Sequence, residues 1–83
     1  MNLEQLRTQI DEIDSSIVEL VKRRMEVCKD IAVEKENTGK NIYDPERERK
    51  KLAEIANMSG DEMRSYTTAL YSLMFDLSKA YQG

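Results

Sequence analysis

The 83-residue sequence contains no histidine, one cysteine, one proline and three glycines. A single cysteine cannot form an intrachain disulfide, and without histidine it does not complete a set of zinc ligands. The lack of histidine also excludes Ser-His and Cys-His nucleophilic catalysis. So little glycine and proline argues against a β-rich or loop-rich fold. These absences together predict an all-α protein with neither a disulfide nor a metal site.

Excess positive charge and long apolar runs are also missing. Sixteen acidic residues against thirteen basic ones leave a net charge of −3, which is too acidic for a general nucleic-acid binder. No apolar run approaches the ~18 residues of a membrane span. The first nine residues have neither the basic nor the apolar region of a signal peptide. We therefore expect one cytoplasmic domain over residues 1–83 that binds neither nucleic acid nor membranes.

Hydrophobic periodicity predicts a long first helix over about residues 2–36, a stretch without glycine or proline. Its apolar residues follow one another in steps of three and four, which is the pattern of a heptad seam. The seam consists of Leu3, Leu6, Ile10, Ile13, Ile17, Leu20, Val27 and Ile31. Gly39 follows in a loop, as glycine often does after the C-terminus of a helix.

Two shorter helices are predicted after this loop, over about residues 45–57 and 60–81. Asp44 and Pro45 have the residue types of an N-cap and a first helical position. Ser59 and Glu62 have the spacing of a capping box for the third helix. The inward-facing residues are predicted to be Leu52, Ile55 and Ala56, and then Met63, Tyr66, Leu70, Leu73, Met74, Leu77 and Tyr81. We therefore expect three helices per chain.

The length of the first helix predicts a dimer. A 35-residue helix is ~52 Å long, whereas a compact chain of this size has a radius of gyration of only ~12 Å. Two short helices cannot cover an apolar seam of that length. We expect an all-helical, intertwined homodimer with a C2 interface; the alternative is a monomeric helical hairpin with a frayed N-terminus.

Three cations on the first helix do not suit a plain core. Arg24 occupies a seam position, and a buried charge costs several kcal/mol unless it is paired; it either binds an anion, fixes the register or reaches to the rim. Lys35 returns to within ~20° of Arg24, ~16 Å further along the axis, although a lysine there also suits the helix dipole. Arg7 lies ~26 Å from Arg24, so the two meet at one small ligand only across an antiparallel dimer.

Polar residues on the later helices form two further groups. Asp44, Arg47 and Glu48 stand at i, i+3 and i+4 and can face one spot, although a cap and two surface charges would look the same. Ser78 and Gln82 stand at i and i+4 beside the apolar stripe of the third helix. Ser78 and Gln82 can face a ligand or can simply be exposed to solvent. For both groups the two explanations stay open when the residues are taken alone.

As a set, these residues resemble the all-helical (AroQ-type) chorismate mutases over essentially the whole chain. The resemblance implies either a bacterial monofunctional enzyme or the mutase domain of a fusion with prephenate dehydratase. The pattern is specific as a set, although no single piece of it is. It runs through Leu6-Arg7, Ile10-Asp11-Glu12-Ile13-Asp14, Arg23-Arg24, Lys35, Asp44-Pro45-Glu46-Arg47-Glu48, Ser78 and Gln82.

The resemblance implies a domain-swapped dimer with three helices per chain. It also implies an intramolecular isomerase that converts chorismate to prephenate by a Claisen rearrangement, in the shikimate route to phenylalanine and tyrosine. This single-substrate step needs no nucleophile, metal or cofactor. It needs a dicarboxylate held in a near-attack shape and positive charge at the ether oxygen of the breaking bond.

By the same resemblance, Arg24 and the partner chain's Arg7 clamp the two carboxylates. Ser78 and Arg47 support this clamp. Arginine suits the role because its planar fork binds carboxylates bidentately and stays charged.

The remaining implied roles concern the substrate's ether oxygen and ring hydroxyl. Lys35 and Gln82 donate hydrogen bonds to the ether oxygen. Glu48, together with the backbone around Asp44, binds the ring hydroxyl. Tyr43 departs from the pattern, because some bacterial members carry a basic residue just before this aspartate.

Three other functions remain open. An isochorismate-pyruvate lyase has the same fold, but its pattern resembles Ala-Pro-Glu-Arg-Val, without the acids at Asp44 and Glu48. A mutase acting on 4-amino-4-deoxychorismate is possible, because Glu48 can face an ammonium as well as a hydroxyl. A helical dimerisation module without chemistry explains the seam but not Arg24 within it.

Overall fold

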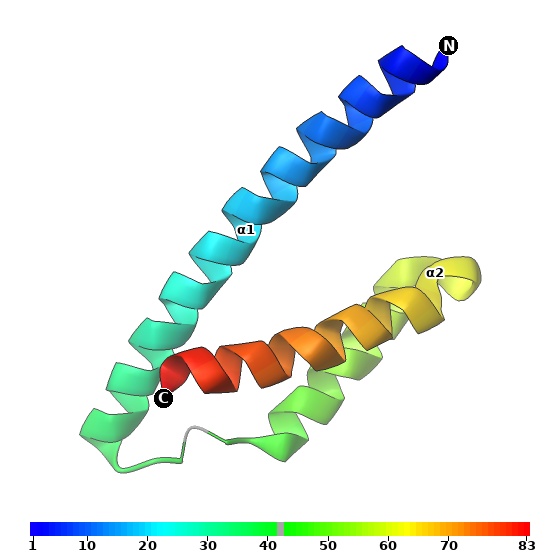
Figure 1. The fold of residues 1–83 in the computed structure, drawn as a ribbon. Coiled ribbons are helices and arrows are strands. Elements are labelled where there is room, and N and C mark those ends of the chain that lie inside the picture. The colour runs from blue at the N-terminus through cyan, green and yellow to red at the C-terminus, as the bar shows by residue number, and fades with distance from the viewer. Residues whose placement is uncertain (42) are drawn as a thin grey trace.

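The computed structural model describes residues 1–41 and 43–83, and these form two helices and no strand (Figure 1). Helix α1 spans Leu3–Thr38 and helix α2 spans Pro45–Gln82. The all-α prediction is therefore confirmed, whereas the prediction of three helices is wrong. The segments predicted as the second and third helices are two limbs of α2, residues 45–59 and 61–82, which join without a loop.

Helix α2 reverses direction part-way along (Figure 1), and the helical backbone is interrupted there at Gly60. Its backbone has φ 76° and ψ 163°, inside an element that is otherwise helical. This region of conformational space is essentially restricted to glycine, because a side chain would clash with the backbone. One residue thus bends the chain, and helical hydrogen bonding resumes directly on the other side. Sequence periodicity cannot distinguish this sharp bend from a loop between two helices.

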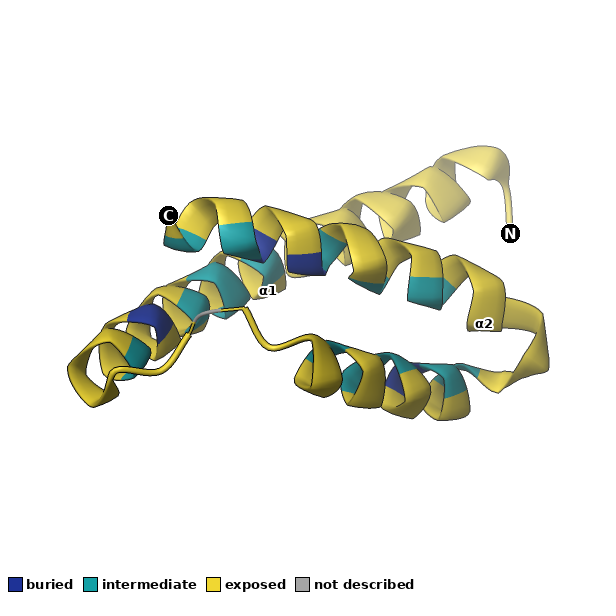
Figure 2. Ribbon diagram, turned by 90° about the horizontal axis from the view of Figure 1, so that it is seen from below, coloured by how far each residue is buried: buried dark blue, intermediate teal, exposed yellow. Residues whose placement is uncertain are grey.

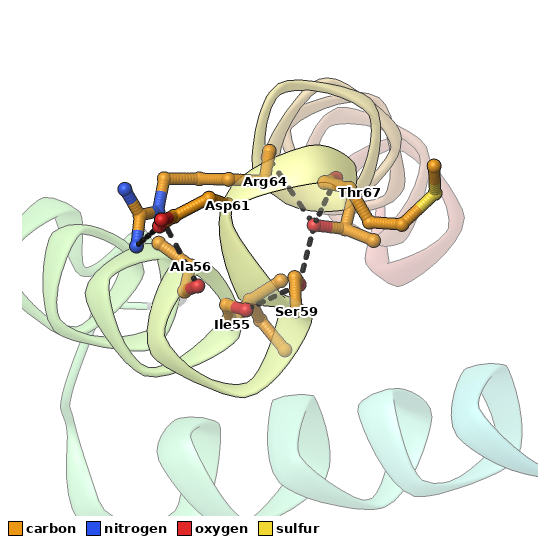
Figure 3. A network of polar contacts seen from close by, with 7 residues as sticks. Ile55, Ala56, Ser59, Asp61, Arg64 and Thr67 are labelled. Carbon is orange, nitrogen blue, oxygen red and sulfur yellow. Dashed lines mark hydrogen bonds and ion pairs between the residues drawn. The ribbon is translucent and has the colours of Figure 1, made fainter.

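Polar contacts tie the two limbs together beside the bend (Figure 3). The hydroxyls of Ser59 and Thr67 lie 2.6 Å apart, and Ser59 also contacts the carbonyl of Ile55. Arg64 reaches back to the carbonyl of Ala56. The predicted capping box is therefore not the role that Ser59 takes, since its hydroxyl bonds to the preceding turn and to the opposite limb.

The helix ends follow the local signals. Asn2 caps α1 by accepting a hydrogen bond from the backbone of Gln5, whose side chain binds the backbone of Asn2 in return. Gly39 ends α1 with a left-handed φ of 73°. Asp44 caps α2, its carboxylate accepting from the backbone N–H of Arg47 at 3.1 Å, and Pro45 is the first helical residue, as predicted.

The core lies where the C-terminal half of α1 meets α2, and the N-terminal half of α1 extends into solvent (Figures 1 and 2). Only Ala32, Ile55, Phe75 and Ser78 are buried among the described residues. Every residue from 1 to 20 is exposed. The radius of gyration is 15.9 Å, against ~12 Å for a compact chain of this length. A single chain therefore leaves much of its apolar surface uncovered.

The face of α1 that packs against α2 is displaced by one residue from the predicted seam. Val21, Met25, Cys28 and Ala32 face inward, whereas the seam residue Val27 is exposed. Along the projecting half, the seam residues are 44–62% exposed: Leu3, Leu6, Ile10, Ile13, Ile17 and Leu20. The second limb of α2 behaves similarly, because Leu70, Leu73 and Leu77 of its predicted stripe are exposed.

Neither α1 nor α2, as described by the structure, contains an apolar stretch of the length needed to span a membrane.

Candidate active site

A cleft of about 170 Å³ lies between the C-terminal half of α1 and both limbs of α2. Seven of the eight residues predicted to bind substrate line it, and Arg7 is the exception. The lining residues are Arg24, Cys28, Ile31, Lys35, Asp44, Arg47, Glu48, Lys51, Phe75, Ser78, Lys79 and Gln82. A larger and more open hollow of about 650 Å³ includes two of them, Lys79 and Gln82.

The charge lining the cleft is predominantly positive. Arg24, Lys35, Arg47, Lys51 and Lys79 contribute cations, against carboxylates at two positions only. A concave surface lined by one sign of charge concentrates ligands of the opposite sign. The cleft is therefore suited to a small anionic ligand with more than one negative group.

Arg24 is half-buried and held by neutral partners. Its Nη1 donates to the Ser78 hydroxyl at 2.9 Å, and its guanidinium lies 5.8 Å from the ring centroids of Tyr71 and Phe75. Among the described residues it forms no ion pair with a carboxylate. These contacts fix the plane of the guanidinium and leave further N–H groups available for a ligand.

Gln82 lies on the same side of the cleft, one turn of helix after Ser78. Its Nε2 donates to the backbone carbonyl of Cys28 on α1 at 2.7 Å. An amide nitrogen carries two N–H donors. The bond to Cys28 therefore orients the amide while leaving its second N–H free to donate elsewhere.

The first turn of α2 brings three of the predicted residues to the cleft. The Asp44 carboxylate is engaged as the cap of the helix, as one of the two explanations of its sequence position proposed. Arg47 and Glu48 follow Asp44 by three and four positions, and both line the same cleft. Lys35 reaches the cleft from α1. It lies on the same face of α1 as Arg24, about three turns further along the helix, so both side chains line one cleft.

Arg7 is the predicted site residue that the single chain does not bring to the cleft. It lies on the exposed, projecting half of α1. Seventeen helical residues separate it from Arg24, which corresponds to ~26 Å along the axis. Nothing within one chain can bring the two side chains to the same small ligand.

Lys79 is a cleft residue that the sequence analysis missed. Its Nζ contacts both carboxylate oxygens of Glu48, at 3.1 and 3.3 Å, and so joins the two limbs of α2. This hydrogen bond raises the pKa of Lys79 above its usual 10.5, although partial desolvation acts in the opposite direction. No sequence signal links two residues 31 positions apart. Lys51, also missed, was detectable, because it follows Glu48 by three positions on the same helix face.

The family model of chorismate mutase type II matches residues 6–83. This chain belongs to the chorismate mutase type II family. A chorismate mutase from Methanocaldococcus jannaschii is 45% identical over 47 residues, which make up 57% of this chain and 48% of that protein. A 3-dehydroquinate dehydratase from Pyrobaculum aerophilum is 32% identical over 77 residues, which make up 93% of this chain and 23% of that protein. No solved structure matches.

The chain thus spans about half of one of these curated relatives and about a quarter of the other. Family membership agrees with the resemblance drawn from Arg24, Lys35, Glu48 and Gln82 in the sequence. The roles of the individual residues stay predictions from that resemblance.

Proposed function

We propose that residues 1–83 form one catalytic domain that converts chorismate to prephenate by a Claisen rearrangement. The observation that carries this proposal is the convergence of five cationic side chains and Gln82 on one cleft of a chain in this family. The substrate has two carboxylates and rearranges only when folded into a near-attack shape. Fixed cations can hold it in that shape, at an entropic cost met on binding rather than in the reaction step.

Arg24 is the residue that we assign to one substrate carboxylate. Ser78 and the rings of Tyr71 and Phe75 hold its guanidinium in place before substrate arrives. A guanidinium positioned in this way can donate two parallel hydrogen bonds to a carboxylate. Arg47, which lines the same cleft from the first limb of α2, supports the second carboxylate.

Lys35 and Gln82 are assigned to the ether oxygen. As the C–O bond breaks, negative charge accumulates on this oxygen, and donors already in position stabilise it more than they stabilise the ground state. The Lys35 ammonium supplies charge, and the free N–H of Gln82 supplies a second hydrogen bond. Glu48, with the backbone at Asp44, accepts a hydrogen bond from the ring hydroxyl.

We further propose that the active form is an intertwined homodimer in which Arg7 completes the partner chain's site. The support is the row of apolar residues along the projecting half of α1, which the described part of a single chain leaves exposed. A second copy of the chain offers a matching apolar face on the second limb of α2. The enclosing context, a bacterial enzyme or a fusion with prephenate dehydratase, and a cytoplasmic location stay predictions from the sequence.

The test is the loss of chorismate absorbance on addition of purified protein, with the product identified. Formation of prephenate, abolished by Arg24→Ala and preserved by the matched variant Arg49→Ala at an exposed position of α2, would support the proposal. Conversion of isochorismate or of 4-amino-4-deoxychorismate, but not of chorismate, would refute it in favour of the corresponding enzyme. A folded dimer that converts none of the three would favour the dimerisation module.

A further inference from the structure

Lys79 is a cation of the cleft that forms an ion pair with Glu48, the residue assigned to the substrate's hydroxyl. Its ammonium lies between the two carboxylate oxygens of Glu48, and the side chains of Glu48 and Lys79 are 23% and 34% exposed. A second carboxylate, that of Asp76, lies 3.7 Å away but is 74% exposed. The more sheltered partner, Glu48, is therefore the one with which the ammonium interacts most strongly.

The ammonium is itself held by the segment that precedes α2. Its Nζ lies 4.6 Å from the centroid of the Tyr43 ring, a distance at which a cation is attracted to the face of an aromatic ring. Lys79 thus contacts the segment before α2, the first limb through Glu48 and the second limb through its own backbone. It also lines both the cleft and the larger hollow, so it forms part of the wall between them.

We propose that Lys79 is a positioning residue of this site, which holds the Glu48 carboxylate in the orientation that accepts the substrate's hydroxyl. This inference rests on the proposed function. A carboxylate has about four lone-pair sites, so Glu48 can bind the ammonium on one side and still accept from a ligand on the other. Without the ammonium, the carboxylate is free to turn toward the neighbouring cations Arg47 and Lys51.

The alternative is that Lys79 only ties the limbs of α2 together. The two roles predict different measurements. A positioning residue acts through Glu48, so its removal lowers kcat/KM of the folded protein only while Glu48 carries a carboxylate. A purely structural tie also runs through Glu48, so it is recognised by a lower free energy of unfolding, while kcat/KM of the folded protein stays within about twofold of wild type.

The experiment is a double-mutant cycle on kcat/KM with Lys79→Met and Glu48→Gln. Lys79→Met keeps the apolar stem and should lower kcat/KM about tenfold, the effect of losing one hydrogen bond of ordinary strength, mostly through a higher KM. In the Glu48→Gln background the same change should cost less than about twofold. Lys79→Arg keeps the positive charge and should retain most of the wild-type kcat/KM. Lys22→Met, which breaks the exposed pair with Glu19, is the matched control and should change nothing.

A second measurement does not depend on turnover. The ¹³C resonance of the Glu48 carboxyl should shift in unliganded Lys79→Met and stay in place in Lys22→Met. An unshifted resonance, an equal loss of kcat/KM in both backgrounds, or a Lys79→Met protein that is less stable but keeps kcat/KM within about twofold of wild type overturns the inference. Wild-type protein that does not convert chorismate refutes the proposed function instead, and the resonance then decides whether Lys79 holds Glu48.

Discussion

The distance between Arg7 and Arg24 makes the shared site testable by mixing two inactive variants. The residues lie ~26 Å apart on one rigid helix, whereas the cleft has a volume of about 170 Å³. In the proposed dimer, each site therefore uses Arg24 of one chain and Arg7 of the other. Each single variant, Arg7→Ala or Arg24→Ala, damages both sites of its own homodimer. Each variant loses an arginine that pairs with a substrate carboxylate away from bulk water, and this loss should lower kcat/KM by at least about thirtyfold.

Mixing the two variants should restore one active site in each mixed dimer. In a mixed dimer, the intact Arg24 of the first chain meets the intact Arg7 of the second, and both substitutions fall in the other site. Equal amounts of the two chains give about half mixed dimers, each with one working site of two, so recovered activity should reach about a quarter of wild type per chain. The assay is chorismate turnover before and after exchange, with exchange confirmed by native mass spectrometry of chains that differ in mass.

Two results would refute the reasoning. Activity that stays at the level of the separate variants after confirmed exchange would show that the site is not shared. Full activity of Arg7→Ala alone would show that Arg7 takes no part in substrate binding. The matched control is Arg24→Ala mixed with Arg49→Ala, which should also yield active mixed dimers, since the second chain supplies Arg24 and both chains supply Arg7.

Three further predictions follow from the same structure. Lys35→Ala should lower kcat by ~10²–10³ if the ammonium stabilises the developing oxyanion, with an unchanged circular dichroism spectrum; a loss below about tenfold would contradict that role. Gly60→Ala should lower the free energy of unfolding by about 1–3 kcal/mol, because φ 76° is strained for any side chain, as measured by urea denaturation; an unchanged midpoint would contradict it. The ion pair of Lys79 with Glu48 should stabilise the fold equally from pH 6 to pH 8, because the pKa of Lys79 is raised above 10.5. Enzyme activity should also stay level over this pH range. The stability contributed by the ion pair should vanish as the pH rises through 10.5 and then through the higher folded pKa, so Lys79→Met should flatten the alkaline loss of stability; an unchanged profile would count against the pair.

Local signals predicted the ends of the helices well. Gly39 ends α1 and Asp44 with Pro45 begins α2, because capping depends on residues only a few positions apart. The start of the predicted third helix failed for the complementary reason. Ser59 has a cap-like spacing, but its hydroxyl found partners in the preceding turn and across the bend.

Helical periodicity also predicted which of the cleft residues lie near one another on each helix. Arg24 and Lys35 share a face of α1, and Arg47 and Glu48 each follow Asp44 by about one turn of α2, because side-chain direction along a helix repeats every 3.6 residues. That these two faces, together with Ser78, line one cleft depends on how α2 folds back at Gly60. The resemblance to a known family anticipated this convergence, which periodicity alone does not.

The sequence by itself determined the helical class, the helix ends at Gly39 and Asp44, and the faces that carry the cations, since each depends on neighbours in the chain. Only the tertiary structure decided that α2 is one bent element, that the face of α1 against α2 lies one residue from the heptad seam, and that Lys79 binds Glu48. Such features depend on the contact of segments distant in sequence. In this chain the seam and the inward face lie side by side on α1, and packing against α2 selected the face that the heptad pattern did not.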